Sequence, residues 1–287
     1  MKVARVFYVA GYGRSGSTLL DTLLGNCPGY WGIGEASNLF EAATRGEGCS
    51  CGRPLRDCPM WGKELAEVLD FESLKNEQRQ AEGLSGLRNG VAGSYYTKFW
   101  TGFLARRALH DVVVVDSSKT SRSTVSRPLQ LGRLGAEVTI VHLTREPESL
   151  LSSLMKGSNK ELAQRIRKSG VDHVFLLRSF IGALFANLAA IVLGRVIFRR
   201  YVHVRYEDLI HAPVNVLSRL GVRGGQALDI SALSTGHAVS GNRMRHANSL
   251  ISIDRNCAAN AERKADVPRF YSLLFGSLGL FSRERHQ

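Results

Sequence analysis

Short apolar runs alternate along this chain with longer segments of helical periodicity. Each run is rich in β-branched residues and is bounded by glycine or polar residues, which is typical of strands buried on both faces. The predicted strands are residues 3–10 (VARVFYVA), 112–115 (VVVV), 138–143 (VTIVHL) and 201–205 (YVHVR). This alternation favours an α/β fold in which a parallel sheet is flanked by helices on both faces.

Helical periodicity fills the segments between the predicted strands. A helix is expected from Thr18, directly after a Gly/Ser-rich turn, and residues 71–109 are expected to be mostly helical. Further predicted helices are 147–156, 160–168 and 173–198. Residues 44–62 are rich in Gly, Cys and Pro and indicate a loop insertion, whereas the chain from about residue 222 has no readable pattern. No linker is evident, so residues 1–287 are expected to form one domain.

The composition is that of a globular protein with an excess of positive charge. Hydrophobic residues make up 44% of the 287 residues, and 38 basic against 25 acidic side chains give a formal charge of +13. Of the basic residues 29 are arginines, whose planar fork suits phosphate and sulfate oxygens. A polyanionic partner is one explanation, and a GC-rich genome that favours Arg codons is another. The arginines are dispersed without a basic run of five, which argues against nucleic-acid binding.

The sequence does not indicate a membrane or secreted protein. The most apolar segment, residues 180–198, is long enough to cross a bilayer, but Asn187 and Arg195 interrupt it. A buried helix is therefore expected there. The first apolar run is short and stops at Ala10, so it does not resemble a secretory signal. We expect a cytoplasmic protein.

The clearest motif is GYGRSGST, residues 11–18, which lies between a predicted strand and a predicted helix. Its spacing is that of a P-loop, with Ser17 in the position of the lysine. Such a turn directs backbone N–H groups and a helix N-terminus at an anion. In nucleotide triphosphatases the lysine reaches the β- and γ-phosphates, so its absence argues against ATP or GTP hydrolysis. Arg14 supplies a positive charge earlier in the loop, which suits a ligand with a single phosphate there.

Residues 11–35, GYGRSGSTLLDTLLGNCPGYWGIGE, resemble the 5′-phosphosulfate loop of sulfotransferases that use 3′-phosphoadenosine 5′-phosphosulfate (PAPS). In that family a strand is followed by a loop such as PRSGTTLL and then by a helix. Gly13 stands where many members have proline. The resemblance implies that the 5′-phosphate and the sulfonate are held by Arg14, Ser15, Gly16, Ser17 and Thr18.

A second motif, VTIVHLTREPESLLSSLMKG, covers residues 138–157. Its strand ends at Arg145, Pro147 opens a helix, and Ser153 follows eight residues after the arginine. Arg145 is thereby placed at the carboxyl end of a strand, where open α/β sheets bind ligands. The segment resembles the family's 3′-phosphate motif, which implies that Arg145 and Ser153 bind that phosphate.

Two further segments resemble parts of the same family. VRYEDL, residues 204–209, is similar to a YEDL segment at the end of a late strand, and it implies that Tyr206 lies near the cofactor. HAVSGNRMR, residues 237–245, is similar to an H-x-x-x-GN-x-x-R segment of bacterial sulfotransferase-like sequences. The resemblance implies a loop over the nucleotide with contacts from Gly241, Asn242 and Arg245.

Sulfuryl transfer needs a base for the acceptor hydroxyl and positive charge for the sulfonate and bridging oxygens. Tyrosylprotein sulfotransferases have a glutamate base at the position corresponding to Glu35, which implies that role here. Lys119 matches a family lysine near the bridging oxygen, and Arg14 would share the charge. His142 and His237 are alternative bases, although the strand position of His142 favours a packed core histidine. This chemistry requires no metal.

Three of the five cysteines, Cys49, Cys51 and Cys58, cluster in GCSCGRPLRDCPMW. Three thiolates and a fourth ligand could hold zinc, but a second cysteine pair is lacking and no histidine lies close in sequence. A local disulfide or packed thiols are therefore expected, and no metal. The segment also recurs in the bacterial sulfotransferase-like group.

The predicted function is transfer of a sulfuryl group from PAPS to a small-molecule hydroxyl acceptor. One alternative is a small-molecule kinase with a degenerate P-loop, against which Ser17 and the pair Arg145 and Ser153 argue. The other is an Arg-rich nucleic-acid-binding protein. Carbohydrate, lipid, phenol and peptide tyrosine all remain open as acceptors, and the oligomeric state is not indicated. The aromatic residues that could line an acceptor pocket, or else pack a core, are Trp31, Tyr95, Tyr96, Phe99 and Trp100.

Overall fold

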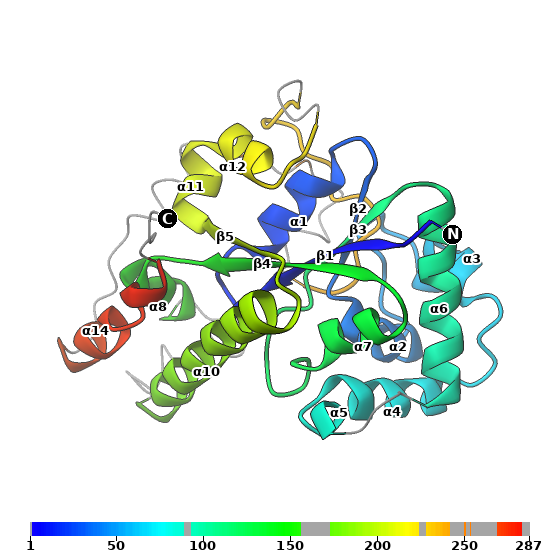
Figure 1. Ribbon diagram of the computed structural model, residues 1–287, viewed down its shortest axis with the longest axis horizontal. Helices are drawn as coiled ribbons and strands as arrows, with labels where there is room; N and C mark the ends of the chain where they lie inside the picture. Colours follow the sequence, from blue (N-terminus) through cyan, green and yellow to red (C-terminus); the bar gives the residue numbers. More distant parts are fainter. Residues whose placement is uncertain are drawn as a thin grey trace.

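The computed structural model describes residues 2–88, 93–155, 173–223, 228–241, 250, 253 and 269–282. Its centre is a sheet of five parallel strands in the order β2-β3-β1-β4-β5 (Figure 1). The strands are β1 (Arg5–Ala10), β2 (Tyr30–Gly34), β3 (Val113–Asp116), β4 (Glu137–Thr144) and β5 (Tyr201–Arg205). The predicted α/β fold with a parallel sheet is confirmed, as are the four predicted strands.

The hydrophobic pattern did not predict β2. Its sequence, YWGIG, contains two glycines, which are depleted in strands and interrupt the apolar run. β2 nevertheless pairs with β3, where Trp31 lies opposite Val114, and Ile33 is buried. Pairing and burial, rather than intrinsic propensity, therefore make this segment a strand.

Helices α1 (Ser17–Gly25), α11 (Tyr206–His211) and α12 (Pro213–Arg219) cover one face of the sheet. Figure 1 shows the three helices together on one side of the strands. Leu20 of α1 packs in one core with Val9 of β1 and Val141 of β4. α1 confirms the helix predicted after the Gly/Ser-rich turn.

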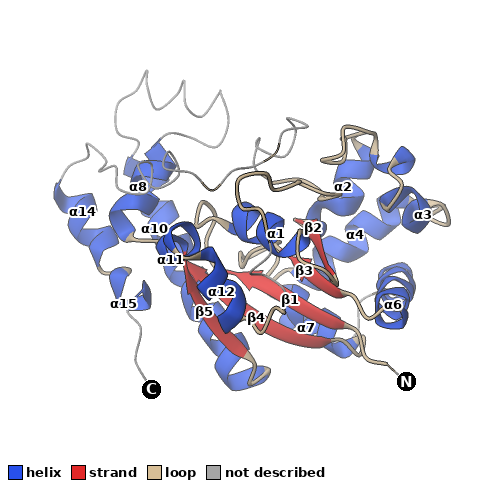
Figure 2. Ribbon diagram, turned by 90° about the horizontal axis from the view of Figure 1, so that it is seen from above, coloured by secondary structure: helices blue, strands red, loops and turns tan. Residues whose placement is uncertain are grey.

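The opposite face carries a larger set of helices from the first half of the chain. Trp61, Trp100 and Phe103 pack there against Val114 of the sheet. The elements are η1 (Ala36–Asn38), α2 (Leu39–Thr44), η2 (Leu55–Asp57), α3 (Trp61–Leu65), α4 (Phe71–Glu82), α5 (Ser85–Arg88), α6 (Ser94–Leu109) and α7 (Arg127–Arg133). Figure 2 shows α2, α3 and α4 gathered beyond β2, at one edge of the sheet. The mostly helical character predicted for residues 71–109 is confirmed where that segment is described.

A smaller core lies beside the β4–β5 side of the molecule, where Leu150, Leu176 and Phe275 pack together. The elements of this part are α8 (Pro147–Met155), α10 (His173–Ile191), the π-helical turn η3 (Val192–Ile197), α14 (Arg269–Gly276) and α15 (Gly279–Ser282). The helices predicted at 147–156 and 173–198 are thus found, whereas the one predicted at 160–168 lies outside the described residues.

Within the described ranges, α10 with η3 is the one segment long and apolar enough to cross a membrane. Of its most apolar window 33% is buried. Ala183 and Ala190 are buried, whereas Ile181 and Leu188 are exposed. The prediction of a buried helix therefore holds for one face only, and length and composition alone are weak evidence for a membrane span.

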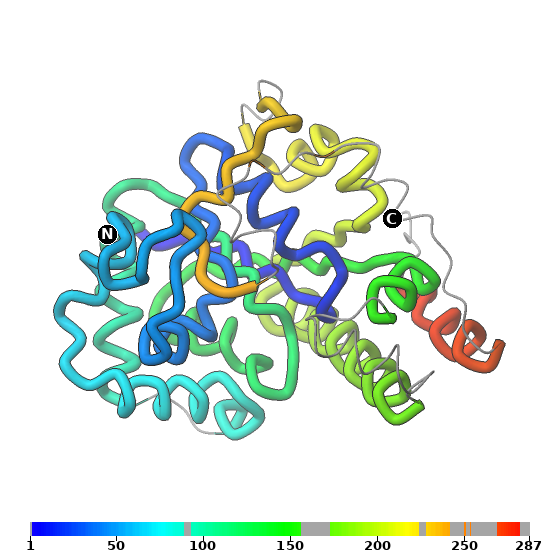
Figure 3. Tube along the Cα trace, turned by 180° about the vertical axis from the view of Figure 1, so that it is seen from behind, coloured from blue at the N-terminus to red at the C-terminus, as the bar shows by residue number. Residues whose placement is uncertain are grey.

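A late segment of the chain returns to the end of β2. Val239 bridges Gly34 in parallel fashion; its N–H donates to the carbonyl of Ile33 at 3.0 Å, and its carbonyl accepts from the N–H of Glu35 at 2.8 Å. Figure 3 shows this segment, in orange, alongside the blue N-terminal part of the chain. Val239 therefore holds the backbone next to Glu35 through hydrogen bonds before and after Gly34.

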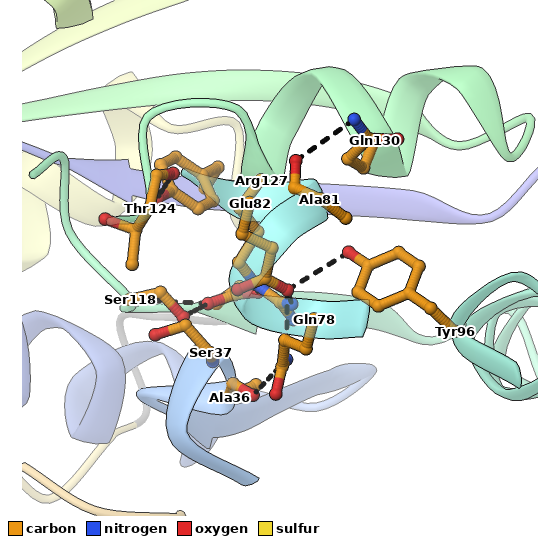
Figure 4. Close-up of polar contacts among 12 residues, drawn as sticks. Ala36, Ser37, Gln78, Ala81, Glu82, Tyr96, Ser118, Thr124, Arg127 and Gln130 are labelled. Atoms are coloured by element: carbon orange, nitrogen blue, oxygen red, sulfur yellow. Dashed lines mark hydrogen bonds and ion pairs between the residues drawn. The ribbon is translucent and has the colours of Figure 1, made fainter. Parts of the chain in front are cut away.

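A buried ion cluster lies beneath the carboxyl end of β3 (Figure 4). The guanidinium of Arg127, at the start of α7, donates to Asp116 Oδ2 at 2.6 Å and forms an ion pair with Glu82 of α4. All three side chains are at most 2% exposed. Burial raises the pKa of the Glu82 carboxyl, and Arg127 opposes that rise. The cluster thus connects β3, α4 and α7, and each buried charge is stabilised by an opposite charge.

Neutral groups add further contacts to this cluster, although Arg127 Nη2 has no hydrogen-bond partner among the described residues. Tyr96 Oη donates to Glu82 Oε1 at 3.0 Å, and Gln78 Nε2 donates to the same oxygen at 2.9 Å. The guanidinium of Arg127 also lies over the ring of Trp100, 4.3 Å from its centroid. Tyr96 and Trp100 therefore belong to the core and not to an open pocket.

His142 of β4 explains the asparagine in the apolar helix α10. Its ring is fully buried, with Nδ1 at 2.7 Å from Tyr201 Oη and Nε2 at 2.8 Å from Asn187 Oδ1. Burial lowers the pKa of His142 to about 4. His142 is accordingly a neutral core histidine, as its strand position suggested.

Stability is expected to fall with acidification between pH 6.5 and 4 because the unfolded chain protonates His142 near its ordinary pKa of about 6.5. The folded chain resists protonation down to about 4, so the contribution is fully present above this window and is lost within it. Its size is on the order of 3 kcal/mol. His142→Gln should make the decline in unfolding free energy shallower, measured by urea denaturation at each pH, although His203 will retain part of the slope. His110→Gln, at an exposed histidine, is the control, and equal slopes for the two variants would contradict the assignment.

Arg127→Met is expected to lower the free energy of unfolding by about 3–5 kcal/mol, because two buried carboxylates lose their cation. Arg133→Met, at an exposed arginine of the same helix that donates to the Gly86 carbonyl at 3.1 Å, should lower it by no more than about 1 kcal/mol. Adding Asp116→Asn and Glu82→Gln to Arg127→Met should recover part of the loss. Denaturant titrations followed by circular dichroism measure all three, and equal stabilities of the two methionine variants would refute the role of the cluster.

Candidate active site

The five parallel strands end at the same edge of the sheet, and the predicted site residues follow these ends. The loop of residues 11–16 follows β1, Glu35 follows β2, and Lys119 lies three residues after β3. Arg145 follows β4, and Tyr206 follows β5. Parallel pairing therefore gathers segments from across the sequence at the ligand-binding edge of an open α/β sheet.

The loop after β1 has the shape of an anion cradle. Gly11 and Gly16 have φ angles of 134° and 97°, and a Cβ on either would collide, with the carbonyl of Leu143 or the ring of Tyr206. A Cβ on Gly13 would meet no atom within 4 Å, so the space at that position is open. α1 begins at Ser17, and the first N–H groups of a helix have no intrahelical partner. The loop can therefore present several N–H groups to one anion.

Two arginines meet beside this loop. Arg14 Nε donates to Ser153 Oγ at 3.1 Å, and Arg145 Nε donates to Ser149 Oγ at 2.7 Å. Arg145 Nη1 also donates to the carbonyl of Arg14 at 3.0 Å, and its guanidinium lies over the ring of Tyr206, 4.1 Å from the centroid. Among the described residues the hydrogen-bond partners of Arg145 are neutral oxygens, and no carboxylate forms an ion pair with it. Half-buried positive charge of this kind is suited to an anionic ligand.

The structure brings Arg145, Ser153, Arg14 and Tyr206 together in one cluster. Ser153, however, bonds with Arg14, and the hydroxyl that contacts Arg145 belongs to Ser149. We missed Ser149, although its position four residues after Arg145, at the start of α8, was a usable signal.

Glu35 and Lys119 form an ion pair across the ends of β2 and β3. Their side chains are 16% and 25% exposed, so both can be reached from solvent. Lys119 has a φ angle of 65°, and its carbonyl accepts hydrogen bonds from Thr124 Oγ1, at 3.0 Å, and from Tyr8 Oη. Asn38 Nδ2 donates to the other Glu35 oxygen at 3.3 Å. The two residues predicted from separate motifs thus lie in direct contact.

Hydrogen bonds connect this ion pair to the buried ion cluster beneath it. Asp116, which contacts Arg127, accepts from the N–H of Ser118 at 3.0 Å and from its Oγ at 2.5 Å. Ser118 Oγ in turn accepts from the N–H of Ser37 at 3.0 Å (Figure 4). Lys119 follows Ser118, and Ser37 lies two residues after Glu35, so the cluster fixes both backbones. The sequence offered one signal for Asp116, namely its position after VVVV.

The remaining predicted residues fall in different places. Gly241, with a φ angle of 102°, follows the segment that bridges β2, whereas Asn242 and Arg245 lie outside the described residues. The ring of His237 faces thiols, with Nδ1 at 3.2 Å from Cys58 Sγ, and burial lowers the pKa of this histidine. That contact argues against His237 as the base.

The aromatic residues considered for an acceptor pocket divide into two groups. Trp31 is 8% exposed and packs with Trp61 and Phe103, which places it in the core with Tyr96 and Trp100. Tyr95 is exposed and Phe99 partly buried; both line a pocket between α6 and the segment that runs from the end of α3 into α4. None of the five therefore extends the cluster of arginines.

A different pocket, of about 290 Å³, adjoins the loop after β1. It lies between that loop, the segment after Lys119 and the exposed side of α10. Its lining residues are Tyr12, Thr120, Ser121, Arg122, Arg178, Ile181, Gly182 and Phe185. The pocket combines an apolar wall with two arginines.

Comparison with solved structures shows the same fold in two sulfotransferase domains. The domain from the Synechococcus PCC 7002 olefin synthase matches with a TM-score of 0.52 and 20% identity, over 99% of this chain and 97% of that one. The domain from the curacin biosynthetic pathway matches with a TM-score of 0.53 and 19% identity, over 96% of this chain and 98% of that one. A search of curated protein sequences gave no significant match.

The sequence profile of the sulfotransferase family matches residues 7–225. This match contains the loop after β1, the ion pair of Glu35 and Lys119, and the arginine cluster. The chain therefore belongs to the sulfotransferase family.

Proposed function

We propose that this sulfotransferase moves a sulfuryl group from PAPS to a hydroxyl acceptor. The observation that carries the proposal is the arginine cluster, in which Arg145, with neutral hydrogen-bond partners, lies against Arg14 in the loop after β1. A donor with phosphates at both its 3′ and 5′ positions supplies two anionic groups to such a site. P-loop nucleotide triphosphatases have a lysine at the position that Ser17 occupies, which argues against a nucleoside triphosphate.

In this proposal the N-terminus of α1 and residues 14–18 hold the 5′-phosphosulfate. Arg145, supported by Ser149 and with Ser153 nearby, holds the 3′-phosphate. Tyr206 keeps the Arg145 guanidinium in place by stacking beneath it. Gly241, Asn242 and Arg245 complete the nucleotide contacts. The family motifs and the shape of the loop support these assignments.

Glu35 is the proposed base, and Lys119 and Arg14 neutralise charge on the transferred group. The acceptor oxygen attacks sulfur as the bond to the bridging oxygen breaks, and the acceptor proton passes to Glu35. The negative charge that develops on the bridging oxygen is stabilised by Lys119. Because Glu35 and Lys119 contact one another directly, the pair must open for each side chain to meet its substrate group.

The pocket beside Tyr12 is the proposed acceptor site. It adjoins both the loop after β1 and Thr120, which follows Lys119. Ile181 and Phe185 offer apolar contact, and Arg122 and Arg178 offer positive charge. These features favour a hydroxyl acceptor with an apolar body and an anionic group. A screen of sulfated products with ³⁵S-labelled PAPS across phenols, lipids, carbohydrates and peptides tests this directly.

Adenosine 3′,5′-bisphosphate, which the donor becomes after transfer, is expected to bind the protein. Arg145→Ala should weaken that binding about 10- to 100-fold. The reason is the loss of a charged hydrogen-bond donor worth about 1.5–3 kcal/mol. Isothermal titration calorimetry measures both affinities. Arg79→Ala removes an exposed arginine paired with Glu41 and should leave the affinity unchanged. If the unmodified protein does not bind the bisphosphate at high micromolar concentration, PAPS is not the donor. Transfer of phosphate from ATP would instead indicate the alternative function, a small-molecule kinase.

Glu35→Gln is expected to reduce kcat by about 10²- to 10⁴-fold, because the amide cannot accept the acceptor proton. The affinity for the bisphosphate should not fall, since Glu35 is not assigned to the nucleotide and its neutralisation releases Lys119 from the ion pair. Rates are measured with labelled PAPS and the acceptor found in the screen. Glu41→Gln on the neighbouring helix α2 is the matched control. Full activity of Glu35→Gln would show that another group is the base.

A further inference from the structure

We propose that Cys49, Cys51, Cys58 and His237 bind one structural zinc ion. Their sulfur and imidazole nitrogen atoms all lie within 4.8 Å of one another. Cys58 Sγ is 3.2 Å from His237 Nδ1 and 3.5 Å from Cys49 Sγ, and Cys49 Sγ is 4.0 Å from His237 Nδ1. Three thiols and an imidazole that converge from two parts of the chain form a Cys₃His set.

The separations agree with tetrahedral zinc coordination. Zinc–sulfur bonds of about 2.3 Å and zinc–nitrogen bonds of about 2.0 Å require neighbouring ligand atoms about 3.5–3.8 Å apart. The distances among Cys49, Cys58 and His237 are 3.2, 3.5 and 4.0 Å, each within about 0.5 Å of these values. All of the described cysteines are free thiols, so of the two expected arrangements, a local disulfide or packed thiols, the structure shows packed thiols. Cysteine and histidine together favour zinc over the oxygen-preferring cations magnesium and calcium.

The backbone around the cysteines is arranged to support the ligands. The N–H of Cys49 donates to the carbonyl of Arg53 at 2.7 Å, and that of Gly52 donates to the carbonyl of Cys49 at 2.9 Å. This tight turn brings Cys49 and Cys51 to one side. The N–H of Trp61 points at Cys58 Sγ at 3.5 Å, a hydrogen bond that stabilises a thiolate.

Residues near the cysteines also form hydrogen bonds with the chain around His237. Trp61 Nε1 donates to the carbonyl of His237 at 2.6 Å. Ser50 Oγ donates to the carbonyl of Gly236 at 2.9 Å and accepts from the N–H of Ala238 at 2.8 Å. The histidine is therefore held next to the thiols by hydrogen bonds that involve no ligand atom. In sequence it lies 179 residues from Cys58, which is why we expected no metal.

The position of the cluster defines its role. Four protein ligands fill a tetrahedral ion, so no position is open for substrate, as in structural zinc sites. Val239, two residues after His237, bonds with the backbone on both sides of Gly34 and so supports Glu35. The zinc ion would thus connect the cysteine segment to the strand end that carries the proposed base.

The direct test is the metal content of protein purified under reducing conditions and reconstituted with Zn²⁺, measured by mass spectrometry of the elements. One zinc ion per chain is expected, together with unmodified thiols by intact-mass analysis. Replacement with Co²⁺ should produce thiolate-to-cobalt absorption and the visible bands of tetrahedral cobalt. Chelation should lower the thermal midpoint, and Zn²⁺ should restore it.

Variants make the assignment specific. His237→Ala and Cys51→Ser, at the two half-buried ligands, should lose the metal and the cobalt bands while keeping the circular dichroism of the fold. Cys27→Ser, at a buried cysteine outside the cluster, should retain both. Less than about a tenth of an equivalent of zinc after reconstitution, a Cys49–Cys58 disulfide in unreduced peptides, or full cobalt bands in His237→Ala would overturn the proposal. None of these readouts depends on sulfuryl transfer.

Discussion

The buried guanidinium of Arg127 is the constraint on which the site depends. It is enclosed by the carboxylates of Asp116 and Glu82, so the three charges are tolerable only when they are together. Asp116 then orders Ser118, and through it Ser37, so that the backbones before Lys119 and after Glu35 have fixed positions. A fully buried charge therefore controls the geometry of the partly exposed pair of Glu35 and Lys119.

The order of the strands divides the site into two halves. β1 lies at the centre, and its neighbours β3 and β4 extend the sheet in opposite directions, which makes the loop after β1 a topological switch point. Towards β4 lie Arg145 and the hydroxyls of α8, which suit anions. Towards β3 and β2 lie Lys119 and Glu35, which suit proton transfer. The two chemistries meet at the loop that contains Arg14.

The sequence pattern predicted those features of the fold and the site that neighbouring residues determine. The four β-branched strands, α1 and the residues that follow strand ends were predictable, because each is encoded within a few residues of its motif. β2 was not, because its two glycines conceal a strand that pairing creates. Glu82 lies 45 residues from Arg127, and His237 lies 179 residues from Cys58, so only the fold brings each pair together. Ser149 is close to Arg145 in sequence, but the family motif indicates Ser153 instead.

The contact between Arg14 and Arg145 has a consequence for turnover. Burial lowers the pKa of Arg145, and the like charge of Arg14 lowers it further, so a bound anion stabilises the charged form of Arg145. In the proposed reaction the donor loses one sulfonate but keeps both phosphates. The contacts that capture the donor are then nearly intact in the bisphosphate product, which would leave slowly. Release of the bisphosphate, rather than sulfuryl transfer, would then be the rate-limiting step.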